Sequence, residues 1–327
     1  MRTTHRVQQA LDGTVLEASS AFARGWVGRW LLAALLVLCG SGAAMAVDRL
    51  VAKTGTDGGT CASTPCFTVG YALSQAAPTG DRIRFLDAIP QSYSENLIIT
   101  KSVEIVGNGS NPGAPGAPNY TALLAPNGGS DQVVLTIRAP NVVIRNLMVV
   151  VDLNNTIQGI RAESSGSFTS DGLLIDNVRV RSETTGSVTS LYGNRNAIMI
   201  NQDEGPDFSV EVRDSIIEAT PLVSPQVLFR AGIDVRNAGL LATGNDITSI
   251  NHDISVRQQA AGQSVQIGGA GALRNTFRGY GVYIASPQAG AGTTSVVNNL
   301  FQPAVAPASP ATEGDLSAMR LIGNASN

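Results

Sequence analysis

The chain has 327 residues, of which 43% are apolar, 14% charged and 5% aromatic, and its formal net charge is −3. This composition is too apolar for a disordered protein, so a packed core is expected. Lys53 and Lys101 are the only lysines. The sequence therefore lacks the clustered basic surface that binding to nucleic acid or to an anionic membrane requires.

The first 46 residues have the organisation of a signal peptide. Arg24 and Arg29 precede the apolar run 30–39, and residues 44–46 (AMA) form a small-x-small cleavage site. The run, about ten residues long, is too short to cross the ~30 Å hydrocarbon core of a bilayer. We therefore expect cleavage after Ala46 and a secreted, periplasmic or cell-surface protein without stable membrane insertion. The alternative is an uncleaved membrane anchor.

Cleavage at this site leaves two cysteines, Cys61 and Cys66, in the sequence CASTPC. An even pair at this spacing in an exported chain indicates one disulfide that closes a small loop. A zinc site would need further soft ligands, and the only histidines are His252 and His5, which lies in the signal peptide. No metal site is therefore expected at the cysteines.

Residues 66–78 carry apolar residues at helical spacing, with Thr68 as a candidate N-cap and Pro78 just beyond the end. Phe67 is among the residues expected on the apolar face. This amphipathic helix is expected to cap the apolar end of the fold that follows it. Residues 47–80 are thus predicted to form an N-terminal disulfide loop and capping helix.

Two series of short apolar segments alternate through the rest of the chain. Segments of the first series align on one amide or carboxylate each, at Asn146, Asn177, Asp214, Asn245, Asn275 and Asn299. Segments of the second series alternate apolar and polar positions with a period of two, as half-buried strands do, at 134–138, 159–163, 197–201, 232–236, 253–257 and 281–285.

The recurrence of short strands at a period within about 20–50 residues predicts an all-β solenoid. Residues 81–301 are expected to form roughly eight coils, each strand pairing in parallel with its equivalent one coil along. A β-sandwich is the alternative, but it would not place two series in fixed alternation. Residues 302–327 are predicted to be a Pro/Ala-rich tail with one last strand.

The aligned amides have a structural role in this arrangement. Asn side chains one coil apart can hydrogen-bond to each other and to the backbone of the bend, which satisfies buried polar groups. We call this set the asparagine ladder, and Asn324 is expected to extend it into the tail.

A family resemblance rests on the stretch 54–109, which resembles the opening of many exported bacterial β-helix proteins. Within it, YSENLIITKSVEIVG (93–107) is similar to the start of pectin methylesterases. From about Val51 to Asn299, the chain resembles the right-handed parallel β-helix proteins of the pectin-lyase-like superfamily, which are built of PbH1 repeats. The resemblance implies a right-handed parallel β-helix, and it implies carbohydrate as a ligand.

The catalytic motifs of the enzymes in this superfamily are not matched. Of the pectin methylesterase block Gly-x-x-Asp-Phe-Ile-Phe-Gly, only Asp207-Phe208 remains, and the Asn-Thr-Asp and Gly-His-Gly motifs of polygalacturonases are missing. The Trp-x-Asp-His and Arg-x-Pro-x-x-Arg blocks of pectate lyases are missing too. We therefore expect an exported protein with a surface interaction or glycan-binding role.

The second series predicts a face on which ligands could lie. Its outward third positions are Thr136, Arg161, Met199, Asp234, Ser255 and Tyr283, and its fifth positions are Arg138, Glu163, Asn201, Arg236, Arg257 and Ala285. Arg236 and Arg257 should stack ~4.8 Å apart, with Asp234 neutralising them only in part, so that a sugar carboxylate could fit between them. The alternative is a solvated mixed-charge surface, with Arg138–Glu163 as an ordinary pair.

The predicted glycan-binding residues on this face are Arg161, Glu163, Asp234, Arg236, Arg257 and Tyr283, with Tyr283 packing on a sugar ring. The alternative function is a polysaccharide lyase or hydrolase acting on a uronate-containing glycan. In that case Asp234, Arg236 and Arg257 are the candidate catalytic residues, and His252 is a candidate general base. Glu163 and Asp234 should lie roughly 12 Å apart, too far for a glycosidase pair.

No cofactor is expected. Asp203, Glu204 and Asp207 cluster in one acidic segment, which is expected to be an ordinary solvated turn. The alternative is that they bind calcium through carboxylate oxygens.

Overall fold

The structure is a computed structural model, and it describes residues 46–108, 121–124, 132–152, 156–183, 195–202, 207–219, 229–249, 252–257, 263–279, 281–285, 293–302, 311–312, 319–322 and 324–326. Apart from Ala46, the predicted signal peptide lies outside these residues. Strands dominate the described part of the chain, which has one α-helix, α2 (Val69–Gln75), and one 3₁₀-helix, η1 (Gly271–Leu273).

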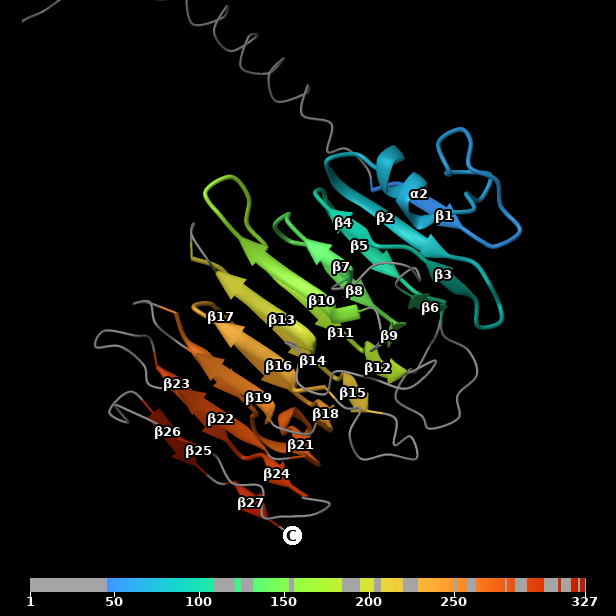
Figure 1. Ribbon diagram of the computed structural model, residues 1–327. Helices are drawn as coiled ribbons and strands as arrows, with labels where there is room; N and C mark the ends of the chain where they lie inside the picture. The colour runs from blue at the N-terminus through green and yellow to red at the C-terminus, as the bar shows by residue number, and fades with distance from the viewer. Residues whose placement is uncertain are drawn as a thin grey trace, which may run out of the picture. The chain divides into compact units, whose positions relative to one another are not determined.

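The strands form three sheets in which neighbouring strands run parallel (Figure 1). Sheet A contains β1 (Asp48–Val51), β2 (Thr79–Phe85), β5 (Ser102–Val106), β8 (Val143–Arg145), β11 (Leu173–Asp176), β14 (Ser209–Arg213), β17 (Gly239–Thr243), β20 (Val265–Ile267), β23 (Thr294–Val297) and β26 (Met319–Ile322). Sheet B contains β3 (Ser92–Ser94), β6 (Thr121–Leu124), β9 (Leu147–Asp152), β12 (Arg179–Glu183), β15 (Ile216–Ala219), β18 (Asp246–Ile247), β21 (Thr276–Phe277), β24 (Leu300–Phe301) and β27 (Ala325–Ser326). Sheet C contains β4 (Leu97–Ile99), β7 (Gln132–Ile137), β10 (Thr156–Ser164), β13 (Asn196–Gln202), β16 (Ala231–Arg236), β19 (His252–Arg257), β22 (Val282–Ala285) and β25 (Ala311–Thr312).

From β2 onward, successive strands enter sheets A, B and C in turn, so each strand pairs with the strand three places along the chain. The parallel pairing of equivalent strands predicted from the sequence is therefore confirmed. A β-sandwich is instead built of antiparallel sheets. Three all-parallel sheets entered in rotation are compatible with a parallel β-helix solenoid.

The alternating pattern of the second series explains how sheet C forms. On β10, Ile160 and Ala162 are 0% exposed and belong to the core, whereas Arg161 between them lies on the other face. The equivalent inward positions of the neighbouring strands are also buried: Leu135, Ile137, Ile198, Ile200, Ile233, Val235, Ile254 and Val256. Each fully buried side chain of this size contributes about 1.5–3 kcal/mol, so the repeated inward positions hold the sheets together.

The N-terminal segment before β2 lies alongside the first strand of sheet A. The predicted disulfide between Cys61 and Cys66 is present, and Cys66 forms a parallel bridge with Val51 of β1. The predicted N-cap is also present, because the Tyr71 N–H donates to the Thr68 hydroxyl at 3.2 Å.

Helix α2 buries Val69, Ala72 and Leu73 and packs against β1, β2 and β4. The prediction that Phe67 belongs to its buried face is wrong, because this side chain is 43% exposed. Phe67 precedes the N-cap and so does not follow the helical spacing. The Lys53 ammonium lies 4.7 Å from the centre of its ring.

The asparagine ladder is present, but it is divided between two adjacent columns of residues. In the first column, Asn146, Asn177 and Asp214 follow strands of sheet A and have φ angles of 55°, 53° and 49°. Asn and Asp adopt this left-handed region more readily than most residues, which suits them to the bend. Asn177 Nδ2 donates to Asn146 Oδ1 at 2.8 Å.

The second column lies one residue further along the chain and forms a continuous chain of hydrogen bonds. Asn245 Nδ2 donates to Asn275 Oδ1 at 3.0 Å, and Asn275 Nδ2 donates to Asn299 Oδ1 at 3.0 Å. Asn299 Nδ2 in turn donates to Asn324 Oδ1 at 3.2 Å, which confirms the predicted place of Asn324. Asn245, Asn275 and Asn299 are at most 2% exposed.

The predicted alignment of Asp214 with Asn245 is therefore wrong by one residue. The pairing of β14 with β17 places Asp214 beside Gly244 and Ser215 beside Asn245, and the Ser215 N–H donates to Asn245 Oδ1 at 3.0 Å. Gly244, with a φ of 69°, takes over the left-handed position of the bend at no steric cost. The amide then occupies the next, buried position.

The sheets extend beyond the range 81–301 predicted for the solenoid. Strand β1 precedes that range as the first strand of sheet A, and β26 and β27 follow it within the predicted tail. The parallel pairing thus begins in the segment that also holds the disulfide.

Candidate functional site

The outward face of sheet C has the register that the sequence predicts. Strand pairing aligns the third positions in the order Thr136, Arg161, Met199, Asp234, Ser255 and Tyr283, and the fifth positions in the order Glu163, Asn201, Arg236, Arg257 and Ala285. Arg236 and Arg257 are therefore direct neighbours on adjacent strands, as predicted.

Several of these outward side chains are buried. Met199 is 5% exposed, and Asp234 and Ser255 are 1% exposed each. A carboxylate removed from water to this degree requires charge partners and hydrogen bonds. The surroundings of Asp234 therefore decide what this face can do.

Asp234 holds two arginines of the same face. Arg236 donates from Nε and Nη2 to Asp234 Oδ2 at 3.2 and 3.0 Å, and Arg257 Nε lies 3.9 Å from Oδ1. The carboxylate side chain is 2% exposed, whereas the side chains of Arg236 and Arg257 are 30% and 29% exposed. One buried negative charge thus holds Arg236 by hydrogen bonds and lies within ion-pair distance of Arg257. We call these three residues the Asp234 clamp.

A group of buried polar atoms surrounds the clamp. Asn196 Nδ2 donates to Asp234 Oδ2 at 3.2 Å, and Gln158 Nε2 donates to Met199 Sδ at 3.3 Å. Within the described part of the chain, four buried oxygens have no hydrogen-bond partner: Asp234 Oδ1, Asn196 Oδ1, Gln158 Oε1 and Ser255 Oγ. Each unpaired buried polar atom costs about 1–3 kcal/mol, so this patch lowers the stability of the folded chain.

His252 and Tyr283 lie at the edge of the same face. Their rings stack with centroids 4.6 Å apart and planes 20° apart. Burial lowers the pKa of His252, and the positive charges of Arg230 and Arg257 lower it further, against the opposing effect of Asp234. The imidazole is therefore neutral at the pH at which an exposed histidine begins to take up a proton. Tyr283, predicted to pack on a sugar, stacks on this imidazole in the structure.

The residue next to His252 is a fully buried carboxylate, Asp253, that joins two other parts of the chain, at Ser249 and at Gly279–Gly281. Asp253 Oδ2 accepts from the N–H groups of Gly279 and Gly281 at 2.9 and 3.0 Å. Ser249 Oγ donates to Asp253 Oδ1 at 3.1 Å. Burial raises the pKa of Asp253 to about 7, because the four hydrogen bonds to the carboxylate only partly offset the loss of water.

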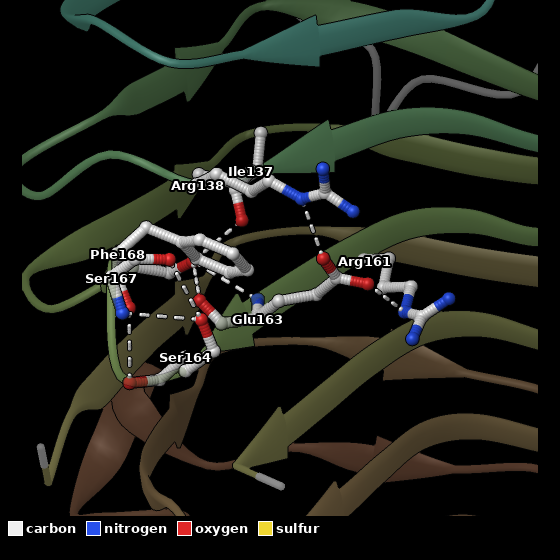
Figure 2. Close-up of polar contacts among 9 residues, drawn as sticks. Ile137, Arg138, Arg161, Glu163, Ser164, Ser167 and Phe168 are labelled. Carbon is white, nitrogen blue, oxygen red and sulfur yellow. Dashed lines mark hydrogen bonds and ion pairs between the residues drawn. The ribbon is translucent and has the colours of Figure 1, made fainter. Parts of the chain in front are cut away.

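A second cluster of the same composition lies on β7 and β10 (Figure 2). Glu163 accepts from Arg138 Nε at 2.8 Å through Oε2, and its Oε1 lies 2.5 Å from Arg161 Nε. The Arg138 guanidinium lies 5.0 Å from the centre of the Phe168 ring. Ser170 Oγ accepts from the Glu163 N–H at 3.0 Å, which fixes the backbone beneath the carboxylate. We call Arg138, Glu163 and Arg161 the Glu163 clamp.

Three of the residues in these clusters were missed by the sequence analysis. Gln158 and Asn196 are paired on adjacent strands, and two polar residues at equivalent strand starts were a signal that could have been used. Phe168 is the one aromatic residue of the segment SSGSFTS. Its contact with Arg138 depends on how that segment folds back, which no periodicity shows.

The acidic segment considered for calcium is only partly described. Asp203 and Glu204 lie outside the described residues, so the choice between a solvated turn and a calcium site is untested. No helix in the described ranges is long and apolar enough to span a bilayer.

A hollow lies on sheet A. Its cavity of about 370 Å³ is lined mainly by Leu173, Leu174, Leu240 and Leu241, with Glu211 among them. The Glu211 carboxylate lies 3.3 Å from Arg213 Nη1 on the same strand. The hollow does not bring together charged groups that could act on a ligand in the way that the two clamps do.

Comparison with known proteins finds no protein family, no curated protein and no solved structure that matches this chain. The function must therefore be argued from the residues of the chain itself.

Proposed function

We propose that the chain is an exported right-handed parallel β-helix of the pectin-lyase-like superfamily. Eight successive strand triplets from β2 to β25 support the predicted number of coils. The contacts of α2 with β1, β2 and β4 support its role as an N-terminal cap. The disulfide supports an oxidising compartment outside the cytoplasm.

We further propose that the outer face of sheet C binds an acidic glycan. The observation that carries the proposal is the Asp234 clamp, in which a carboxylate with 2% exposure orients two arginines that remain partly exposed. Because the arginines are already fixed, little side-chain entropy is lost when an anion binds them. Arginine forks match carboxylate and sulfate groups, and charge-assisted hydrogen bonds are the stronger kind.

The proposal is tested by calorimetry on residues 47–327 with acidic and neutral polysaccharides. We expect binding to acidic polymers that weakens with added salt and is markedly weaker in Arg257→Gln. Arg213→Gln on sheet A, which removes the same charge from another face, should leave binding unchanged. Equal binding of neutral and acidic polymers, or equal loss in both variants, would show that the clamp is not the site.

A second candidate function is a polysaccharide lyase, and the His252–Tyr283 stack favours it. With a uronate carboxylate neutralised by the arginines, His252 would remove the C5 proton and the Tyr283 hydroxyl would protonate the leaving O4 as the C4–O4 bond breaks. The electron pair from the C5–H bond forms the C4=C5 double bond, so the step needs no further reactant.

The lyase reaction is tested by following ultraviolet absorbance of unsaturated ends, and separately reducing sugar, on uronic-acid polysaccharides. Turnover by the wild type that is lost in His252→Ala while binding remains would establish the lyase. Binding without turnover on all polymers would leave the glycan-binding role and remove the enzymatic one.

A further inference from the structure

The two arginine clamps of sheet C share one design. In each, a single carboxylate lies beneath two arginines, and both arginines are more exposed than the acid. The Glu163 side chain is 10% exposed, against 38% for Arg138 and 31% for Arg161. Asp234 is 2% exposed, against about 30% for its partners. Each clamp therefore presents two positive charges above one negative charge.

The clamps are separated by one strand that carries no charge at the aligned positions. Strand β13 lies between β10 and β16 and contributes Met199 and Asn201 to the two outward columns. Glu163 and Asp234 are thus two strand spacings and one column apart, a distance of roughly 12 Å. No acidic side chain stands between the clamps at these aligned positions to repel an anionic chain laid across them.

Arg138 of the Glu163 clamp is held from two directions, and Arg161 is ion-paired with Glu163. Arg138 is fixed on one side by Glu163 and on another by the Phe168 ring. The Glu163 N–H donates to Ser170 Oγ, which itself donates to the Ile137 carbonyl on the adjacent strand at 2.7 Å. An isolated exposed ion pair is worth little, but this one is supported by neighbours on three sides.

We propose that the Glu163 clamp is a second anion subsite, and that one acidic glycan chain bridges both clamps across β13. This inference rests on the proposed function and adds the form of the ligand. The ligand is a polymer or oligomer whose anionic groups recur at roughly 15 Å, because the midpoints of the two arginine pairs lie three strand spacings apart, and it is not a single sugar acid. Met199 and Asn201 lie under the sugar that joins the two anionic groups.

Bridging has a consequence that distinguishes it from binding at one clamp. Once the first anionic group is bound, the second binding step is intramolecular, and affinity rises by about 10²–10⁴ without any new type of contact. An oligosaccharide too short to reach both clamps binds each one separately. The affinity should therefore increase abruptly at the length that spans the two clamps.

The test is calorimetry of residues 47–327 with a series of acidic oligosaccharides of increasing length. The variants are Arg161→Gln in the Glu163 clamp, Arg236→Gln in the Asp234 clamp, and Arg213→Gln on sheet A as the matched control. For the wild type we expect two short oligosaccharides per chain, but one long oligosaccharide with at least about tenfold higher affinity. Arg161→Gln should bind the long oligosaccharide only as well as the short one, with one short oligosaccharide per chain.

Arg161→Lys keeps the positive charge but lacks the planar guanidinium group. It therefore serves as a control for a folding defect caused by Arg161→Gln. It should retain part of the length dependence, and the melting temperature of each variant is measured in parallel. The second subsite is refuted if affinity shows no abrupt increase with oligosaccharide length. It is also refuted if Arg161→Gln binds the long oligosaccharide with wild-type affinity. If Arg236→Gln still loses binding in that case, the proposed function stands. Absence of binding to every acidic glycan refutes both.

Discussion

Replacing Asn275 with alanine removes the central member of the buried ladder column. Its Oδ1 accepts from the Asn245 N–H at 2.9 Å and from Asn245 Nδ2 at 3.0 Å. Its Nδ2 donates to the Ala242 carbonyl at 2.9 Å and to Asn299 Oδ1 at 3.0 Å. The substitution therefore leaves groups on both neighbouring coils without their partner.

The expected loss follows from these contacts. A net value of about 0.5–1.5 kcal/mol for each of the hydrogen bonds gives roughly 2–6 kcal/mol of unfolding free energy. The upper part of the range is favoured because Asn275 is 0% exposed, so water cannot replace the lost partners. This is a large fraction of the stability of an ordinary domain.

Asn177→Gly provides the contrasting substitution in the first column. Asn177 is half-buried and has a φ of 53°, and its side chain donates one hydrogen bond, to Asn146. Glycine adopts this φ without strain, so the loss of the hydrogen bond is partly offset and the change should stay within about 1 kcal/mol. The difference between the two substitutions follows from the one-residue shift between the columns.

The assay is chemical denaturation of residues 47–327 together with hydrogen exchange of the Asn245 amide. Exchange is needed because repeat proteins can unfold in parts, which makes a single unfolding free energy incomplete. We expect Asn275→Ala to lower the denaturation midpoint and to speed exchange at Asn245. A change below about 1 kcal/mol with unchanged exchange at Asn245 would refute the structural role of the column.

Three further predictions concern titration and the disulfide. The pKa of Asp253 is raised from 3.8 to about 7 in the folded chain, so its contribution to stability is complete below the lower value and is lost as pH rises through the higher one, by up to roughly 4 kcal/mol. Asp253→Asn should therefore flatten the fall in melting temperature between about pH 4 and pH 7. Parallel profiles of melting temperature against pH would contradict this. An anion bound nearby raises the pKa of His252, which is lowered in the free chain, so glycan affinity should increase from about pH 8 to pH 5. Calorimetry should show a smaller increase for His252→Gln. An unchanged pH dependence in this variant would show that His252 is not the group responsible. Reduction of the disulfide between Cys61 and Cys66 should lower the unfolding free energy by about 2 kcal/mol, which is the entropic contribution of closing a small loop. An unchanged denaturation midpoint would contradict this.

Much of the face of sheet C could be predicted because a strand places alternate residues on opposite faces. Once the period of two is recognised, the alignment of Arg236 with Arg257 depends only on matching one strand with the next. The structure has that register. The burial of Asp234 could not be predicted in this way, because it depends on neighbours from several coils.

The ladder shows where sequence alignment alone becomes ambiguous. Around Asp214 and around Asn245, a shift by one residue keeps a polar residue at the aligned position, since Ser215 follows Asp214 and Gly244 precedes Asn245. Only the pairing of the flanking strands selects the register. The backbone offers the physical reason, because the left-handed residue must stand at the same point of each bend.

The clamps illustrate a second limit of sequence reasoning. The ion pair between Arg138 and Glu163 could be predicted as a contact between adjacent coils, but its strength could not. The support comes from Phe168 and Ser170, which lie in a segment without periodicity. Residues that fold back onto a sheet from such a segment are invisible to a repeat pattern, yet they determine whether an exposed ion pair is firmly held.

The most direct test of the account is a crystal structure of residues 47–327 with an acidic oligosaccharide. We predict that the glycan lies on the outer face of sheet C, with one anionic group hydrogen-bonded to Arg236 and Arg257. A glycan bound instead in the hollow of sheet A, or one that contacts neither arginine, would contradict the account.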